Sequence, residues 1–296
     1  MKSAHFLSAA LTLFLATCAA TESPAAGGLF GELPPGALSH SVQERVHGEI
    51  CVDLLLPLEV VQAELPPGQR AVSVPERAAR DPELAEALRA HPELAGRALV
   101  SLCFLALDTF EIDGRTPYPP GSVSAAFLWA YVTPSDTPAD ARMLGKRNFV
   151  QLRAWYPAAG AERALVLATD PMAEFTEVTM RRAGPDTFDL TLVLAGERLE
   201  GRVRTVGERQ PMNRPSPAFM TVPSAGRFAD FFTVYTYYGH HLWSTEATWQ
   251  TSGNGQLASA FAETSATLGL STILEDGWSA RSGLYRIEPS AGRSRP

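Results

Sequence analysis

The sequence predicts an α+β domain that is mainly antiparallel β, with a barrel-like core and a few helices. Three observations support this fold class. Short apolar runs of strand length follow one another from Ala98 onward, and Gly, Pro and Asp turns separate them. The clearest helical spacing is confined to one region, residues 75–96. No change of composition and no internal repeat divides residues 41–288, so we expect a single domain there.

The first half of the chain is expected to combine strands with one helical region. A strand is predicted over residues 47–56, and a short helix that begins at a proline is predicted over residues 57–65. Leu65–Gly68 are then expected to form a turn. Residues 75–96 are charged and Ala-rich, so we expect them to be an exposed insertion and not a core element. Further strands are predicted over three apolar or alternating runs: 98–107, 122–132 and 148–156.

The second half is predicted to continue as a meander of strands that closes on itself or stacks as a sandwich. Its strands are expected over residues 163–168, 175–182, 187–194 and 198–206. Residues 207–226 are rich in proline and are expected to be loop. The aromatic stretch 231–249 is interpreted as a pair of strands that fill the core, with an apolar cavity wall as the alternative. Residues 289–296 are expected to be a frayed tail.

The N-terminus predicts export. Lys2 precedes an apolar run over residues 6–16, which has the length of a signal-peptide core and is too short to span a bilayer. Residues 1–18 are therefore interpreted as a signal peptide, and residues 19–40, rich in Ala, Gly, Pro and Ser, as a flexible tether. The expected location is the periplasm or the outer membrane.

The three cysteines bear on the same question. Leu15–Cys18 has the shape of a lipobox, in which Cys18 becomes the lipidated first residue; ordinary cleavage after Ala20 is the alternative. Lipidation of Cys18 would leave Cys51 and Cys103, which both lie in strand-like runs. Two interpretations of this pair stay open: two buried free thiols, or a disulfide in an oxidising compartment.

Composition and motifs exclude several classes of function. The net charge of -7 and the absence of a Lys/Arg run argue against nucleic-acid binding. The sequence has no Gly-x-Ser-x-Gly motif and no phosphate-binding loop. The adjacent pair His240–His241 would point to opposite faces of a strand, so we expect no metal site and no cofactor. The expected partners are a small-molecule substrate or ligand, and the membrane if Cys18 is lipidated. A homo-oligomer is an alternative to a monomer.

Lys146 is the candidate nucleophile. It is the only lysine after Lys2, in a chain that otherwise uses arginine for its cations. Arginine stays protonated, whereas a desolvated lysine loses its proton and becomes a nucleophile. The alternative interpretation is a surface lysine at a turn.

The order of these features resembles the acetoacetate decarboxylase superfamily over roughly residues 46–240. The resemblance begins with a Leu-Pro strand end and a Leu-Pro turn. It continues with two strands, then an acidic stretch, an Arg, a Gly and a Lys that lead into a third strand. The corresponding segments are Leu56–Gly68, Ala98–Leu107, Gly114–Val132, Asp136–Pro138, Arg142, Gly145, Lys146–Arg147 and Phe149–Leu152.

The resemblance implies a Schiff base between Lys146 and a small oxo acid, with Arg147 as the cationic neighbour that keeps the amine uncharged. The candidate substrate-binding residues are Tyr118, Trp129, Tyr235 and Tyr237. The family's glutamate after the tyrosine of the middle segment has no counterpart, since Pro119–Gly121 follow Tyr118. We therefore keep an alternative: an exported lipoprotein that binds a small apolar ligand in a barrel cavity without chemistry.

Overall fold

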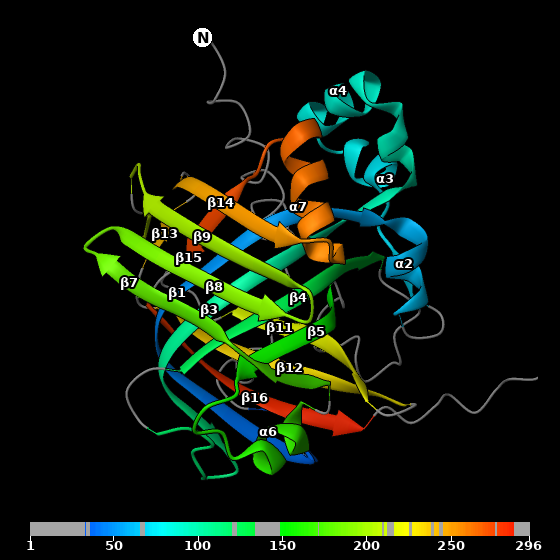
Figure 1. The fold of residues 1–296 in the computed structure, drawn as a ribbon. Coiled ribbons are helices and arrows are strands. Elements are labelled where there is room, and N and C mark those ends of the chain that lie inside the picture. The colour runs from blue at the N-terminus through cyan, green and yellow to red at the C-terminus, as the bar shows by residue number, and fades with distance from the viewer. Residues whose placement is uncertain are drawn as a thin grey trace, which may run out of the picture.

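The structure is a computed structural model (Figure 1). It describes residue 33 and residues 36–65, 69–119, 123–133, 149–170, 172–208, 210–211, 216–224, 227–237, 240–242, 245–275 and 277–286. For the described residues between 210 and 245, the structure describes the backbone alone. Lys146, Arg147, Cys18, the predicted signal peptide and the predicted tail at 289–296 lie outside the described residues. Among the residues that are described, no helix is long and apolar enough to span a membrane.

The strands form two sheets. The smaller sheet has the order β14-β9-β8-β7, with β7 (Val178–Gly184), β8 (Thr187–Leu194), β9 (Glu197–Thr205) and β14 (Thr245–Gly253). The larger sheet contains β1 (Ser39–Pro57), β2 (Arg70–Ala71), β3 (Arg97–Ile112), β4 (Val123–Thr133), β5 (Phe149–Pro157), β6 (Ala173–Thr176), β10 (Gln210–Pro211), β11 (Ser216–Ser224), β12 (Arg227–Tyr237), β13 (His240–Leu242), β15 (Thr272–Glu275) and β16 (Trp278–Arg286).

The pairings within the larger sheet return to the strand from which they start. β1 pairs with β3, β3 with β4, and β4 with β5, all antiparallel. β5 pairs with β11 in parallel, and antiparallel pairings then join β11 to β12, β12 to β16 and β16 back to β1. This ring of pairings is the barrel-like core, and the predicted α+β, mainly antiparallel fold is confirmed.

The outward face of β1, β3 and β4 packs against the smaller sheet. Phe104 of β3 lies under Trp249 of β14, with ring centroids 6.1 Å apart, and Trp249 in turn contacts Phe261 of α7 (Gln256–Thr267) at 5.0 Å. Gly201 of β9 leaves room for the indole, because a Cβ atom there would lie 2.5 Å from Trp249. The opposite face of β1, β3 and β4 points into the ring.

Helices cover both ends of the inward face. At one end, Leu165 and Val166 of α6 (Arg163–Thr169) pack with Tyr118 and other aromatic side chains. At the other end lie α3 (Val74–Ala78), α4 (Pro82–Ala90) and the 3-10 helix η1 (Pro92–Gly96). The remaining helix, α2 (Leu58–Ala63), follows β1 and occupies most of the predicted short helix at 57–65.

The structure corrects the interpretation of residues 75–96 as an exposed insertion. The region forms helices, as predicted, but Val74, Ala78, Leu84 and Leu94 are buried in a common cluster with Leu55 and Leu99 of the sheet. The helices therefore complete the core at the end of the ring. The charged positions that suggested exposure lie on the other faces of these short helices, so composition alone was misleading.

Three boundaries or assignments also differ from the sequence predictions. Residues 163–168 form helix α6 and not a strand, because a short apolar run does not distinguish a buried helix from a buried strand. The predicted loop 207–226 contains β10 and β11, and pairing with β12 along its whole length keeps β11 extended despite its prolines. The predicted tether 19–40 ends two residues early, because β1 begins at Ser39.

Candidate functional site

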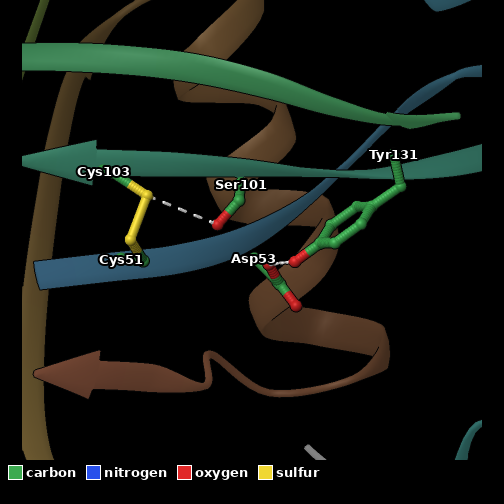
Figure 2. Close-up of a disulfide and its surroundings, with 5 residues drawn as sticks. All are labelled: Cys51, Asp53, Ser101, Cys103 and Tyr131. Atoms are coloured by element: carbon green, nitrogen blue, oxygen red, sulfur yellow. Dashed lines mark hydrogen bonds between the residues drawn. A yellow bond between two sulfur atoms is a disulfide. The ribbon is translucent and has the colours of Figure 1, made fainter. Parts of the chain in front are cut away.

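A row of polar side chains crosses the inward face of the ring. Strand register places Asp53 of β1 opposite Ser101 of β3, Ser101 opposite Trp129 of β4, and Trp129 opposite Gln151 of β5. Tyr131 lies two residues beyond Trp129, on the same face of β4. Figure 2 shows the Asp53, Ser101 and Tyr131 side chains converging between β1, β3 and β4.

Asp53 is the centre of this polar cluster. The Tyr131 hydroxyl donates to Asp53 Oδ1 at 3.4 Å, and Arg77 Nη2 of α3 donates to Asp53 Oδ2 at 3.5 Å. The Arg77 guanidinium also lies over the Tyr131 ring, 4.5 Å from its centroid. Both charged side chains are largely buried, with 12% of Arg77 and 17% of Asp53 exposed. We call Asp53, Arg77, Ser101 and Tyr131 the Asp53 cluster.

The surroundings of Asp53 favour its protonated form over its carboxylate more strongly than water does. Burial raises the pKa of Asp53, and this effect outweighs the lowering of that pKa by Arg77, Ser101 and Tyr131. Burial and the nearby Asp53 carboxylate raise the pKa of Tyr131 to about 12, so its hydroxyl remains a hydrogen-bond donor at neutral pH. Asp53 is thus suited to hold and release a proton inside the ring.

A cavity of about 500 Å³ adjoins the Asp53 cluster between α4, α7 and the inward face of β1 and β3. Its apolar wall comes from Leu84, Ala87, Leu99 and Leu268. Its charged lining consists of Asp53, Asp81, Glu83, Glu86 and Arg77. Carboxylates therefore outnumber cations, and the cavity suits a neutral or cationic molecule better than an anion.

Cys51 and Cys103 form a disulfide, which decides the alternative that the sequence left open. The two residues lie directly opposite each other on β1 and β3, with their Cα atoms 4.0 Å apart. The Ser101 hydroxyl lies 3.7 Å from Cys103 Sγ, so the disulfide adjoins the Asp53 cluster (Figure 2). A carboxylate oxygen of Glu49 and both sulfur atoms lie within 4.8 Å of one another, but the bonded sulfurs are not thiolate ligands for a metal.

Of the predicted substrate-binding residues, Trp129 lies beside the Asp53 cluster. It is opposite Ser101 and stacks on Phe127, with ring centroids 5.7 Å apart. Tyr118 lies apart from the cluster, among the side chains that pack on α6, and its hydroxyl donates to the Pro157 carbonyl at 3.1 Å.

The other predicted site residues have no described side chains. Tyr235 and Tyr237 lie on β12, where register places them opposite Ala280 and Trp278 of β16. Lys146 and Arg147 precede β5 and fall between the described ranges 123–133 and 149–170.

The sequence analysis missed Asp53, Arg77, Ser101 and Tyr131. A signal for Asp53 was present, because it is the only charged residue between Glu49 and Glu59 in an otherwise apolar strand run. A buried carboxylate in such a run needs a partner. Arg77 was hidden because helix α3 lies some twenty residues further along the chain, and only the tertiary structure brings it to β1.

A second buried carboxyl has its hydrogen bonds satisfied. Gln151 Nε2 donates to Asp170 Oδ2 at 2.8 Å, and the Tyr156 hydroxyl donates to the same oxygen at 3.2 Å. The Met172 amide donates to Asp170 Oδ1 at 3.3 Å. These bonds anchor the chain after α6 to β5, so we treat Asp170 as structural.

Comparisons with known proteins show which fold this is. No protein-family model and no curated protein sequence matches the chain. The chain is similar in structure to acetoacetate decarboxylase from Legionella pneumophila subsp. pneumophila str. Philadelphia 1, with a TM-score of 0.50 and 7% identity over 88% of this chain and 90% of that one. It is also similar to an acetoacetate decarboxylase-like enzyme from Sphingomonas wittichii RW1, with a TM-score of 0.46 and 12% identity over 88% of this chain and 100% of that one.

The described strands and helices define an α+β protein with a ring of mainly antiparallel strands. Its fold is acetoacetate decarboxylase-like, as the order of sequence features predicted. At 7% identity the similarity concerns the fold, and the chemistry has to be argued from this chain's own residues.

Proposed function

We propose that this is an exported protein that forms a Schiff base between Lys146 and a small oxo acid. The observation that carries the proposal is the position of Phe149, the third residue after Lys146. Phe149 pairs with Tyr131 in the β4–β5 register, and their ring centroids lie 5.0 Å apart. Because Phe149 pairs with Tyr131, β5 begins beside the Asp53 cluster, and we propose that Lys146, three residues earlier in the sequence, works together with that cluster.

The chemistry assigns a role to each group. The uncharged Lys146 amine attacks the carbonyl carbon of the oxo acid, and the resulting carbinolamine takes up a proton and loses water to give an iminium ion. When the substrate is a β-oxo acid, the bond from its α-carbon to the carboxylate then breaks, carbon dioxide departs, and the electron pair moves into an enamine. A proton added to the enamine carbon, followed by hydrolysis, releases the product and the lysine. Arg147 is the cationic neighbour that lowers the pKa of the Lys146 amine.

The Asp53 cluster contains a carboxyl group that takes the place of the family's glutamate, which has no counterpart after Tyr118. Enamine protonation needs an acid that keeps a proton near neutral pH, and burial raises the pKa of Asp53 in that direction. Trp129, opposite Ser101 in the same cross-strand row, provides an apolar surface beside the Asp53 cluster. Asp53 is therefore the residue that we propose as the proton donor.

The Cys51–Cys103 disulfide supports the exported location, because disulfides persist in oxidising compartments and are rare in the cytosol. Attachment through Cys18 is part of the same proposal. A Cys18→Ala variant should move from the membrane fraction to the soluble periplasmic fraction. An unchanged membrane fraction would argue against lipidation.

The alternative function is binding without chemistry, and the cavity beside the Asp53 cluster favours it. A small ligand with an apolar body would contact Leu84, Leu99 and Leu268 there. Because the lining is rich in carboxylates, we expect a neutral or cationic ligand. Thermal unfolding in the presence of such compounds tests this function without reference to Lys146.

Borohydride trapping tests the Schiff base. The mature chain contains a single lysine, so after incubation with acetoacetate or pyruvate and reduction, an adduct on any ε-amino group must lie on Lys146. Lys146→Arg is the matched control, since it keeps the charge and cannot form the adduct. Asp53→Asn should still be trapped but should form product at least about a hundredfold more slowly in steady state, because the enamine waits for its proton. Absence of label with several oxo acids would refute the enzyme and leave the binding function.

A further inference from the structure

The Cys51–Cys103 disulfide lies among groups that a structural cross-link does not require. Glu49, two residues before Cys51 on the same face of β1, brings a carboxylate oxygen within 4.8 Å of both sulfur atoms. On the other side, the Ser101 hydroxyl lies 3.7 Å from Cys103 Sγ. An acid and a hydroxyl donor thus flank the bond.

We propose that Cys51–Cys103 is an exchange-active disulfide that accepts electrons from a dithiol, with Glu49 as the acid that protonates the departing sulfur. This activity is independent of Lys146 and of the proposed Schiff base. It rests on the arrangement of Glu49, the two cysteines and Ser101 across β1 and β3.

Exposure sets the direction of attack. Cys51 is partly exposed, whereas only 4% of Cys103 is exposed. An external thiolate therefore attacks Cys51 Sγ, and Cys103 Sγ is the leaving group. The buried thiolate that forms at Cys103 needs stabilisation, and Ser101 supplies a hydrogen bond while Glu49 supplies a proton.

Atoms and electrons balance over two steps. In the first, a bond forms between the reductant sulfur and Cys51 Sγ, the Cys51–Cys103 bond breaks, and the proton of Glu49 passes to Cys103. In the second, the other thiol of the reductant attacks the reductant sulfur that is bonded to Cys51. The reductant then leaves with an internal disulfide. Cys51 then takes up the proton of that second thiol, and Glu49 recovers the proton that the first thiol released. Two electrons pass from the dithiol to the protein.

The electrostatics of Glu49 suit this role. Its backbone is paired directly opposite Glu275 of β15, so two carboxyl groups occupy neighbouring strands. Burial, and then repulsion by Glu275, raise the pKa of Glu49 to about 8. At pH 7 Glu49 is therefore mainly protonated and is available as an acid. Among the residues whose side chains are described, Glu275 is the charged group that acts on Glu49.

Reduction of the Cys51–Cys103 disulfide is also expected to affect the Asp53 cluster. Ser101 contacts Cys103 Sγ, lies opposite Asp53 in the β1–β3 register, and lowers the pKa of the Asp53 carboxyl. A thiolate or thiol at Cys103 would compete for the Ser101 hydroxyl, so the redox state of the disulfide is expected to alter the hydrogen bonds that Asp53 receives.

Reduction of the folded full-length mature protein by dithiothreitol tests the proposal. The rate is measured by alkylation and mass spectrometry between pH 6 and pH 9.5, and each rate is divided by that of a small reference disulfide to remove the ionisation of the reductant. We expect this ratio to fall as the pH rises through about 8, where Glu49 loses its proton. A ratio that does not change with pH would overturn the proposal.

The Glu49→Gln variant separates an acid from a merely structural residue. If Glu49 is the acid, the variant is reduced at least about tenfold more slowly at pH 7, and the difference disappears above pH 9. If Glu49 only supports the fold, the variant opens more readily and its disulfide is reduced faster. Equal or faster reduction would therefore refute the role of Glu49. Reduction of the wild type no faster than global unfolding would refute exchange activity altogether.

Discussion

The buried pair of Arg77 and Asp53 offers a quantitative test of how the inward face of the ring is built. Arg77→Met keeps a long apolar side chain but removes the guanidinium that lies 3.5 Å from Asp53 and 4.5 Å from the Tyr131 ring. Breaking a buried pair by removing one partner costs about 3–5 kcal/mol, because the other charge stays buried. The long separation favours the lower end, so we expect about 3 kcal/mol of lost stability at pH 8.

The double variant isolates the interaction. Asp53→Asn with Arg77→Met removes both charges, so the remaining cost is the lost contact of the cation with the Tyr131 ring, about 1–2 kcal/mol. The coupling energy between the two positions should therefore be at least about 1–2 kcal/mol, which is the difference between the cost of Arg77→Met alone and the cost of the double variant. Urea unfolding followed by the fluorescence of the five tryptophans provides the four free energies. A coupling energy below about 0.5 kcal/mol would refute the pair as an energetic unit.

The pH dependence gives an independent check. Arg77 lowers the pKa of Asp53, so its removal raises further a pKa that burial already raises. The folded variant then keeps a proton on Asp53 at pH values where the unfolded chain has lost it. Stability of the variant should therefore fall as the pH rises above the unfolded value near 4, and its deficit should be smaller at pH 5 than at pH 8. Equal deficits at both pH values would contradict the assignment. Arg202→Met, which removes an exposed partner of Asp189, is the control and should change stability little.

Three further predictions concern packing, titration and capping. Gly201→Ala should destabilise by about 1–3 kcal/mol, because the new Cβ would overlap Trp249, whereas Gly96→Ala meets no atom within 4 Å and should be tolerated; urea midpoints compare the two. The folded protein keeps a proton on Glu49 up to about pH 8, whereas the unfolded chain releases this proton near pH 4.5. The free energy of unfolding should therefore fall as the pH rises between these two values. Glu49→Gln should remove this pH dependence in thermal scans between pH 5 and pH 9. Ser73→Ala should cost about 1 kcal/mol through loss of the capping box of α3, and an unchanged unfolding free energy would show that this helix end is not stabilised by its cap.

Strand positions in the first half of the chain were predictable because their signal is local. The predicted strands 47–56, 98–107, 122–132 and 148–156 correspond to parts of β1, β3, β4 and β5. Period-two patterning also placed Phe127, Trp129 and Tyr131 on one face of β4. The order of these segments around Leu-Pro turns was sufficient to predict the acetoacetate decarboxylase-like fold. Residues 163–168 were assigned wrongly because their apolar run fits either a strand or a helix.

Sequence alone made Lys146 a candidate by its residue type, and it left Cys51 and Cys103 as a pair on the condition that Cys18 is lipidated. Only the tertiary structure decided that Cys51 faces Cys103, because that contact depends on the register of two strands some fifty residues apart. The same holds for the Asp53 cluster, which joins β1, β3, β4 and α3. Burial and pairing of a charge depend on which distant segments surround it, and this physical information is absent from any local pattern. The sequence therefore determined most strands of the first half and a candidate nucleophile by residue type, whereas the packing of the ring decided that Asp53, Arg77 and Tyr131 meet.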